Sequence, residues 1–217
     1  MEFLTISKIL LIALLPIVLF LLVLDFASFD ETFYKEKFSE YGVQKIVPNT
    51  ILLHEKVIKF ISGKNIELPN EFNEREKQHL MDVRKAVNYS TILLYALIAM
   101  FIILLVISAF TLKVSNYITS FVGKVLVFGG FLTIILSAML FFLIYFDFSS
   151  AFENFHLMLF EKGTYTFDPA KEMIVRLYPE RLFMDLGLRI SKFVFFTSIF
   201  FILIGGFLIF KSKKQKH

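Results

Sequence analysis

The sequence predicts an all-α, polytopic membrane protein with four transmembrane helices and two extracytoplasmic, partly interfacial helical segments. Three observations support this fold class. Of the 217 residues, 57% are hydrophobic, whereas an ordinary soluble domain is about 45–50% apolar. Four stretches are apolar over the roughly 20 residues that a helix needs to cross a bilayer. Lysine and arginine are distributed unevenly among the links between these stretches.

The four predicted spans are residues 5–24, 89–112, 125–146 and 193–210. Only the first contains a charged residue, Lys8, which lies near one end. This span occupies the position of a signal peptide, but its apolar core runs unbroken from Ile9 to Leu24. No A-x-A-like cleavage site follows before the acidic Asp25. We therefore expect an uncleaved anchor.

The positive-inside rule predicts the orientation of the spans. The link after the second span holds Lys113 and Lys124 and no acid, and the tail after the last span is also basic. The longer links are nearly balanced, with ten basic against eleven acidic residues in 25–88 and six against seven in 147–192. We expect both termini in the cytoplasm and both longer links outside. The net charge of +4 then reflects topology and not a nucleic-acid surface.

Three helices are expected in the first outer segment. Residues 26–41 alternate aromatic and charged side chains, as in a helix at the membrane surface. The next helix carries His54 on its apolar face and ends at Gly63. Asn73, with Glu76 three residues later, is a capping-box pattern that begins the third helix. No Gly or Pro interrupts that helix before the second span, so we expect it to continue into the membrane.

The second outer segment, residues 147–192, is too amphipathic and aromatic for a solvated loop. Ser150 and Glu153 form another capping-box pattern. On the predicted helix, His156 lies in the middle of an apolar face. The other members of that face are Phe152, Phe155, Leu159 and Phe160. Gly163 is placed to end the helix.

A further helix is predicted to begin with Asp168 as its N-cap and Pro169 at its first position. It must end before Pro179, which cannot continue a helix. Residues 182–192 are amphipathic and lead into the last span. We assign Asp168 and Pro169 a structural role: Asp168 caps this helix, so that the stretch folds back over the expected pocket at His156. No repeat or low-complexity linker divides residues 1–217, so we expect a single membrane domain.

Histidine is the side chain best suited to chemistry here. The chain has no cysteine, which excludes a thiol nucleophile and a thiolate metal site. Neither H-E-x-x-H nor G-x-S-x-G occurs, so a zinc protease and a serine hydrolase are not indicated. No ionisable side chain lies deep in a span, which argues against ion-coupled transport. We expect no metal and no cofactor.

Two histidines occupy equivalent positions in the predicted topology. His79 lies about ten residues before the second span, and His156 about ten after the third. Because these spans form a hairpin, both imidazoles are expected on the outer side, within roughly 15 Å of the membrane border. Asp82 follows His79 at i+3 and would orient its ring. This constellation suits acid–base catalysis on a lipid ester. The alternative is that each ring packs against a backbone carbonyl. His54 has no acid at i+3 or i+4, and for it we favour interfacial packing.

Three sequence patches resemble one membrane family. They are HLMDV at 79–83, FHLMLF at 155–160, and YTFDP at 165–169 followed by EMIVRLYPERLF at 172–183. Together with four spans, they resemble the bacterial lipoprotein intramolecular transacylases. The architecture matches over most of the chain, and the motifs cover about thirty residues.

The resemblance implies transfer of an sn-2 acyl chain from a diacylglyceryl-cysteine lipoprotein to the α-amino group of that cysteine. It places the family's histidines at His79 and His156, leaving open which is the base. Arg84, Arg176 and Tyr165 are the expected substrate contacts, although basic residues at membrane borders often serve only as anchors. The implied partners are diacylglyceryl-modified lipoproteins and lipid of the cytoplasmic membrane, with no nucleic acid. An acyltransferase for another lipid and a non-enzymatic scaffold or accessory subunit remain the alternatives.

Overall fold

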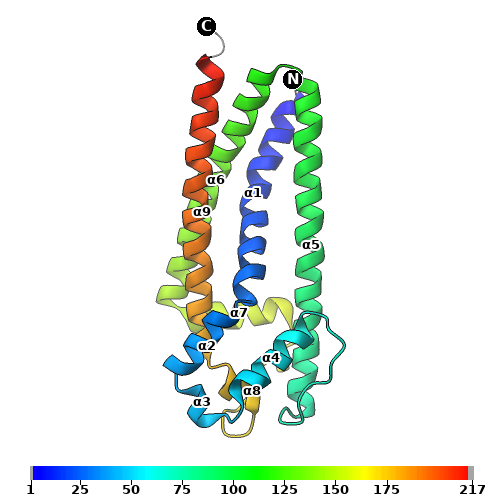
Figure 1. Cartoon of the computed structure of the whole chain (residues 1–217), viewed down its shortest axis with the longest axis vertical. Helices are drawn as coiled ribbons and strands as arrows, with labels where there is room; N and C mark the ends of the chain where they lie inside the picture. The colour runs from blue at the N-terminus through cyan, green and yellow to red at the C-terminus, as the bar shows by residue number, and fades with distance from the viewer. Residues whose placement is uncertain (1, 215–217) are drawn as a thin grey trace. The chain divides into compact units, whose positions relative to one another are not determined.

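The computed structural model describes residues 2–214 and confirms the predicted fold class. The described residues form helices without strands, and four of the helices are long and apolar enough to cross a membrane. His217, the fourth histidine, lies outside the described residues. The helices, shown in Figure 1, are α1 (Glu2–Ser28), α2 (Glu31–Glu40), α3 (Val43–Ile46), α4 (Thr50–Ile61), α5 (Glu74–Leu112), α6 (Ser115–Phe146), α7 (Phe148–Leu159), α8 (Met173–Leu177) and α9 (Glu180–Lys214).

The chain groups into two compact units. The membrane unit comprises the chain up to Asp25, Leu93–Phe142 and the chain from Leu188 onward. The histidine unit comprises Phe26–Ile92 and Leu143–Gly187. Helices α1, α5, α6 and α9 each contribute to both units, α1 with only its last three residues in the histidine unit. The description of the chain as a single domain stays a prediction.

The membrane unit is built from α1 and the apolar parts of α5, α6 and α9. Its core includes Leu11, Phe121 and Val125. The α6 and α9 backbones approach closely: a Cβ on Gly205 would lie 2.7 Å from the carbonyl oxygen of Gly123. Small residues permit this approach between membrane helices. A Cβ on the neighbouring Gly206 would have no heavy atom within 4 Å, so only Gly205 is needed for this approach.

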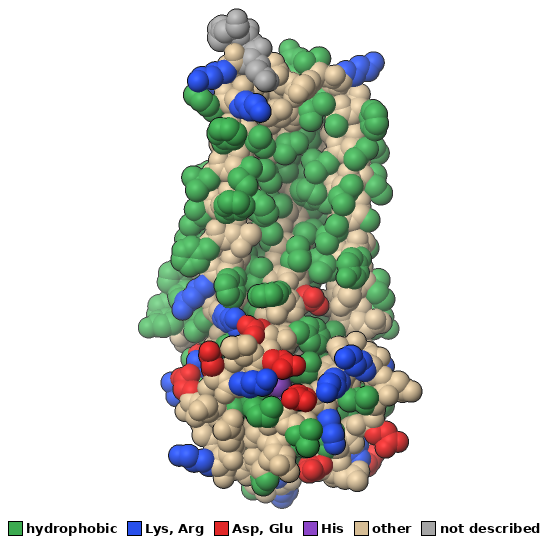
Figure 2. Space-filling model, in the orientation of Figure 1, with side chains coloured by type: hydrophobic (Ala, Val, Ile, Leu, Met, Phe, Trp, Pro, Cys, Tyr) green, Lys and Arg blue, Asp and Glu red, His purple; other side chains and the backbone are tan. Residues whose placement is uncertain are grey.

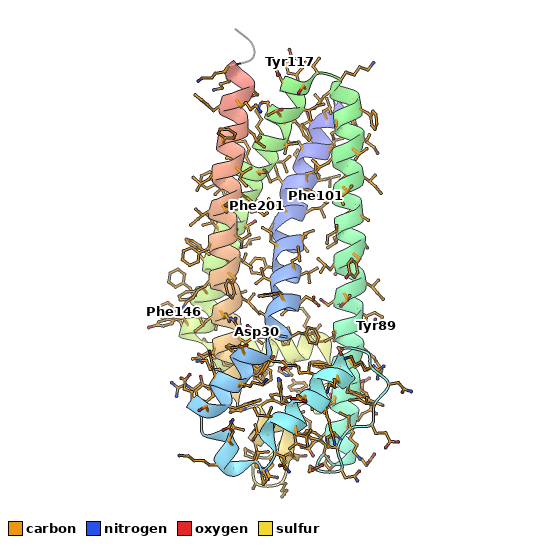
Figure 3. The ribbon with its side chains drawn as sticks, viewed as in Figure 1. Asp30, Tyr89, Phe101, Tyr117, Phe146 and Phe201 are labelled. Carbon is orange, nitrogen blue, oxygen red and sulfur yellow. The ribbon has the colours of Figure 1, made fainter. Side chains whose placement is uncertain are left out.

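The surface of the membrane unit is apolar. On the face shown in Figure 2, hydrophobic side chains cover most of its helices, with a few basic side chains at one end, whereas acidic and basic side chains are mixed on the histidine unit. Aromatic residues mark both ends of α6: Tyr117 lies in its first turn, and Phe146 is its last residue (Figure 3). Both rings are exposed. Since the chain has no tryptophan, such tyrosine and phenylalanine rings are its candidates for the aromatic belts at a membrane interface.

Helix α5 begins as its capping box predicts. The Asn73 side-chain oxygen accepts from the Glu76 N–H at 3.0 Å, and the Asn73 N–H donates to Glu76 Oε2 at 2.7 Å. The helix then runs without interruption for 39 residues, which confirms the predicted continuity. Its polar turns belong to the histidine unit, and its apolar part, residues 93–112, belongs to the membrane unit. The link to α6 is only Lys113 and Val114, shorter than expected because Lys124 lies within α6.

Helix α7 departs from its predicted bounds. Asp147 is the N-cap and accepts from the Ser150 N–H at 3.2 Å, so the helix begins before the predicted Ser150–Glu153 box. It ends at Leu159, and Gly163 instead adopts its positive φ of 90° in the turn that follows. The inward stripe consists of Phe152, His156 and Phe160, spaced four residues apart. Phe155 and Leu159, predicted to share this face, are exposed.

The Asp168–Pro169 prediction is wrong as a helix start. Asp168 closes a turn instead, accepting from the Ala170 N–H at 2.9 Å. Helix α8 begins only at Met173, with Glu172 as its N-cap, and ends before Pro179 as expected. Residues 160–172, which we call the aromatic loop, therefore join α7 to α8 without regular secondary structure.

Candidate active site

The histidine unit brings the two predicted histidines together. His79 lies near the start of α5, and His156 lies near the end of α7. Their ring centroids are 6.3 Å apart, and the ring planes differ by 19°, which is a stacked arrangement. His79 is buried, with 7% of its surface exposed, and His156 is half-buried.

Aromatic rings surround this pair. Phe160 and Phe167 of the aromatic loop lie 5.0 and 5.4 Å from the His79 ring centroid. Phe152 lies 4.2 Å from the His156 ring, on the preceding turn of α7. Tyr165, a predicted substrate contact, lies 5.0 Å from His156. The imidazoles therefore occupy an apolar environment that the loop helps to build.

One hydrogen bond defines the tautomer of His156. Its Nδ1 lies 2.7 Å from the backbone carbonyl oxygen of Phe152, one turn earlier on α7. A carbonyl oxygen only accepts, so Nδ1 must carry the proton. In the neutral ring, Nε2 then presents a lone pair. His156 is thus prepared to take up a proton at Nε2.

The environment favours the neutral form of both imidazoles, because it lowers the pKa of each ring. Burial, reinforced by the neighbouring His156, lowers the pKa of His79 from 6.5 to about 4, although the carboxylate of Asp82 opposes the shift. Burial also lowers the pKa of His156, against the opposing effect of its bond to Phe152. Burial acts in this direction because a low-dielectric environment disfavours the charged imidazolium.

The predicted orientation of the His79 ring by Asp82 is not seen, because no hydrogen bond from the imidazole to the carboxylate is formed. The Asp82 carboxylate accepts from Lys85 Nζ at 2.9 Å and from Gln78 Nε2 at 3.4 Å. His79 Nδ1 is buried and has no hydrogen-bond partner among the described residues. An i+3 carboxylate can also turn to cations on its own helix, and Asp82 does so. It acts on His79 through its charge and not as an orienting partner.

The two predicted substrate arginines hold backbone segments in this structure. Arg84 donates to the Gly63 carbonyl at 2.9 Å, and its guanidinium lies 4.9 Å from the Phe60 ring centroid. Arg176 Nε donates to the Glu172 carbonyl at 3.2 Å. Their role in binding substrate stays a prediction.

His54 is a packed residue, but it lies in a buried core and not at an interface, and its partner is a side chain. It is fully buried, and its Nδ1 lies 3.0 Å from the Tyr178 hydroxyl. The rings of Tyr34 and Phe38 lie 4.4 and 5.2 Å away. Burial lowers its pKa to about 4. This cluster lies in the core of the histidine unit and includes neither His79 nor His156.

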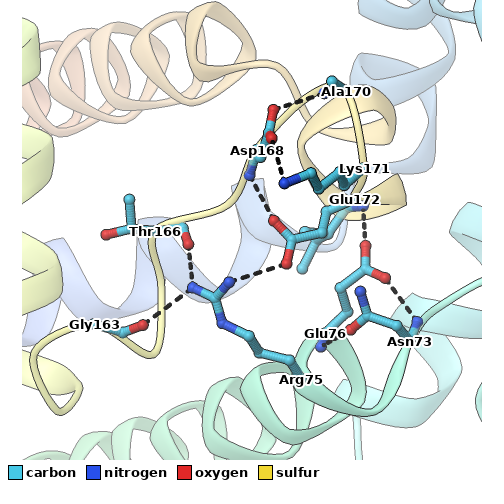
Figure 4. A network of polar contacts seen from close by, with 10 residues as sticks. Asn73, Arg75, Glu76, Gly163, Thr166, Asp168, Ala170, Lys171 and Glu172 are labelled. Carbon is cyan, nitrogen blue, oxygen red and sulfur yellow. Dashed lines mark hydrogen bonds and ion pairs between the residues drawn. The ribbon is translucent and has the colours of Figure 1, made fainter.

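A polar network lies beside the histidine pair, as Figure 4 shows. The sequence analysis did not predict it. Arg75 forms an ion pair with Glu172 at 3.0 Å and donates to the carbonyl oxygens of Gly163 and Thr166. Glu76 accepts from the Ile174 N–H at 2.6 Å, besides capping α5. In the sequence, Arg75 looks like any charge on a solvated helix, and no local pattern reveals partners about ninety residues away.

The fold and site together define an all-α, multi-pass membrane protein with a shielded histidine pair. A family model described as lipoprotein intramolecular transacylase Lit matches residues 9–183. The chain therefore belongs to this family of membrane acyltransferases, as the three sequence patches indicated. No curated protein sequence matches the chain.

Solved structures of one family member share the fold. The lipoprotein intramolecular transacylase Lit from Bacillus cereus is 21% identical, with a TM-score of 0.83 over 98% of this chain and 99% of that one. Two variants of the Bacillus cereus protein, with a histidine replaced by arginine or by alanine, are also 21% identical, with TM-scores of 0.79. These matches cover 100% and 98% of this chain and 96% of each variant.

Proposed function

We propose that this protein moves the sn-2 acyl chain of a diacylglyceryl-modified lipoprotein to the α-amino group of its N-terminal cysteine, with His79 and His156 as the catalytic pair. Membership of the transacylase family supports the class of reaction. The observation that carries the residue assignment is the stacking of two imidazoles at 6.3 Å within a shell of aromatic rings. Such a shell suits an acyl ester and excludes water that would hydrolyse it.

His156 is the general base in this proposal. The α-amino group of the substrate has an ordinary pKa of about 7.7–8.0 and must lose a proton to become a nucleophile. The hydrogen bond from Nδ1 to Phe152 leaves Nε2 of His156 unprotonated. Nε2 therefore accepts the proton as the amine nitrogen attacks the ester carbonyl carbon.

His79 is the electrophilic partner. Its low pKa keeps the ring neutral, and a neutral imidazole N–H donates a hydrogen bond to the oxyanion of the tetrahedral intermediate. Collapse of that intermediate breaks the bond to the glyceryl oxygen, which takes the proton from His156. The products are an amide and a free sn-2 hydroxyl. The amine and ester belong to one substrate, so proximity lowers the barrier without an enzyme nucleophile.

Mass spectrometry of lipoprotein N-termini tests the function. Cells that produce this protein should contain N-acylated, lyso-type lipoproteins, and cells without it should retain a free α-amino group on a diacylglyceryl cysteine. Unchanged lipoproteins together with an altered acylation of another lipid would identify a different acceptor. No change in any acyl product would support the scaffold alternative.

The active site is proposed to face the outside of the cytoplasmic membrane, where lipidated cysteines lie. Single cysteines at Lys64 and Lys162 should react with an impermeant thiol reagent added to intact cells. Cysteines at Ser115 and Ser212 should react only after the membrane is permeabilised. The background is clean because the chain has no cysteine. The reverse labelling pattern would contradict the proposed topology.

A further inference from the structure

Arg75 joins α5 to the aromatic loop through three acceptors. Its guanidinium pairs with Glu172 and donates to the Gly163 and Thr166 carbonyl oxygens. The three acceptors span ten residues of the loop, and each contacts the same side chain. Arginine can do this because its planar guanidinium presents five N–H donors in a fixed fork.

The carboxylate of Glu172 extends this network along the loop. It is buried, with 8% of its side chain exposed. Its second oxygen accepts from the Asp168 N–H at 2.5 Å, and the Asp168 side chain in turn accepts from Ala170. A buried carboxylate requires such partners, since leaving it uncompensated is costly. Arg75 and Glu172 therefore depend on one another in fastening the second half of the loop (Figure 4).

The fastened loop carries the rings that cover the histidines. Phe167 lies between the two held residues Thr166 and Asp168. Its ring is 4.9 Å from the Arg75 guanidinium and 5.4 Å from the His79 ring. Tyr165, next to Thr166, lies against His156. A chain of direct contacts thus connects Arg75 to both imidazoles.

We infer that Arg75 is a positioning residue for the proposed acyl transfer: it fastens the aromatic loop to α5, so that Phe167 and Tyr165 shield the histidine pair from water. The effect of Arg75 on acyl transfer rests on the proposed function, whereas its effect on the shielding of the histidines from water does not. An ion pair that is half exposed contributes little alone, and the Arg75 side chain is 48% exposed. The effect arises from one side chain holding three separated points of the loop.

Releasing the loop should raise the pKa of His79. Burial is the main cause of its low pKa, and the Arg75 cation also lowers it. In Arg75→Ala, water reaches the ring and the cation is gone, so both effects weaken. The pKa should rise from about 4 toward 6.5. Arg75→Lys keeps a cation but cannot span three acceptors, and it should give an intermediate shift.

Histidine-selective NMR titration of the full-length protein in lipid nanodiscs measures this directly, because the chain has only four histidines. The acidic limb of the transfer rate should move to higher pH in the same order of variants. Trypsin should cleave after Lys162, in the loop, several times faster in Arg75→Ala than in the wild type. Lys77→Ala is the matched control, since Lys77 lies on the same helix and pairs with the exposed Glu74. It should change none of these measurements.

Unchanged His79 titration and unchanged cleavage in Arg75→Ala would overturn the inference. Slower transfer with an unshifted titration would also overturn it, since Arg75 would then contact the substrate. If Arg75→Ala does not fold, Glu172→Gln is a milder test. It removes the charge that pairs with Arg75 but keeps an acceptor oxygen and the Arg75 cation, so the pKa of His79 should rise by less than in Arg75→Ala. A shifted titration in a protein that transfers no acyl chain would sustain the shielding and refute the proposed function.

Discussion

His156→Gln should lower the rate of acyl transfer by roughly 10²–10⁴-fold, the usual contribution of a general base. Glutamine can occupy a similar volume, but its amide has no basic nitrogen. His79→Gln should lose less than His79→Ala, because a glutamine N–H can still donate to the oxyanion. Substitution by glutamine should therefore reduce the transfer rate more at position 156 than at position 79. Transfer in nanodiscs, followed by mass spectrometry of the lipopeptide, measures each rate.

Glu153→Gln is the matched control on α7. Glu153 is exposed, and the variant should retain the wild-type rate. If His156→Gln keeps its activity while His79→Gln loses it, the base and the electrophile must be exchanged. If His79→Ala and His156→Ala both fold and transfer normally, the paired-histidine mechanism is wrong.

The pairing of these histidines was predictable because it follows from topology. His79 and His156 lie about ten residues from the ends of adjacent spans, and the short link between α5 and α6 makes those spans antiparallel. Hydropathy and helix periodicity are local properties, so the spans and helices can be predicted directly from the sequence. Position along two neighbouring helices then follows from the rise per residue. What could not be predicted is the direction in which each side chain turns.

Competition among polar side chains explains the predictions that failed. Asp147 caps α7 ahead of the Ser150–Glu153 pattern, since both are good capping candidates within one turn. The Asp168–Pro169 start yields only a single turn, because the backbone of Glu172 is extended (φ −113°, ψ 132°) and α8 begins after it. Asp82 had two partners on its own helix besides His79. A sequence shows which groups can pair locally, but the choice depends on partners that only the fold supplies.

Glu76 shows how one residue can satisfy a local pattern and a long-range requirement together. Its carboxylate closes the α5 capping box with Asn73 and also accepts from the Ile174 N–H in the first turn of α8. The first N–H groups of a helix have no partner within that helix. Glu172, the N-cap of α8, makes no side-chain cap bond. The acceptor for Ile174 is therefore supplied by α5.

Glu76→Ala should accordingly destabilise the histidine unit by about 3 kcal/mol, because it leaves two N–H groups without their charged acceptor. Glu76 is 1% exposed, so water cannot easily replace the carboxylate. Glu74→Ala, two residues earlier, should change stability by less than about 0.5 kcal/mol, as is usual for an exposed site. The Glu74 side chain is 91% exposed and pairs only locally with Lys77. Hydrogen exchange should show faster exchange at Ile174 in Glu76→Ala but not in Glu74→Ala, alongside a lower melting temperature. Equal protection at Ile174 in both variants would mean that another group accepts from the Ile174 N–H. Glu76 would then not be what holds α8, and with it the end of the aromatic loop, to α5.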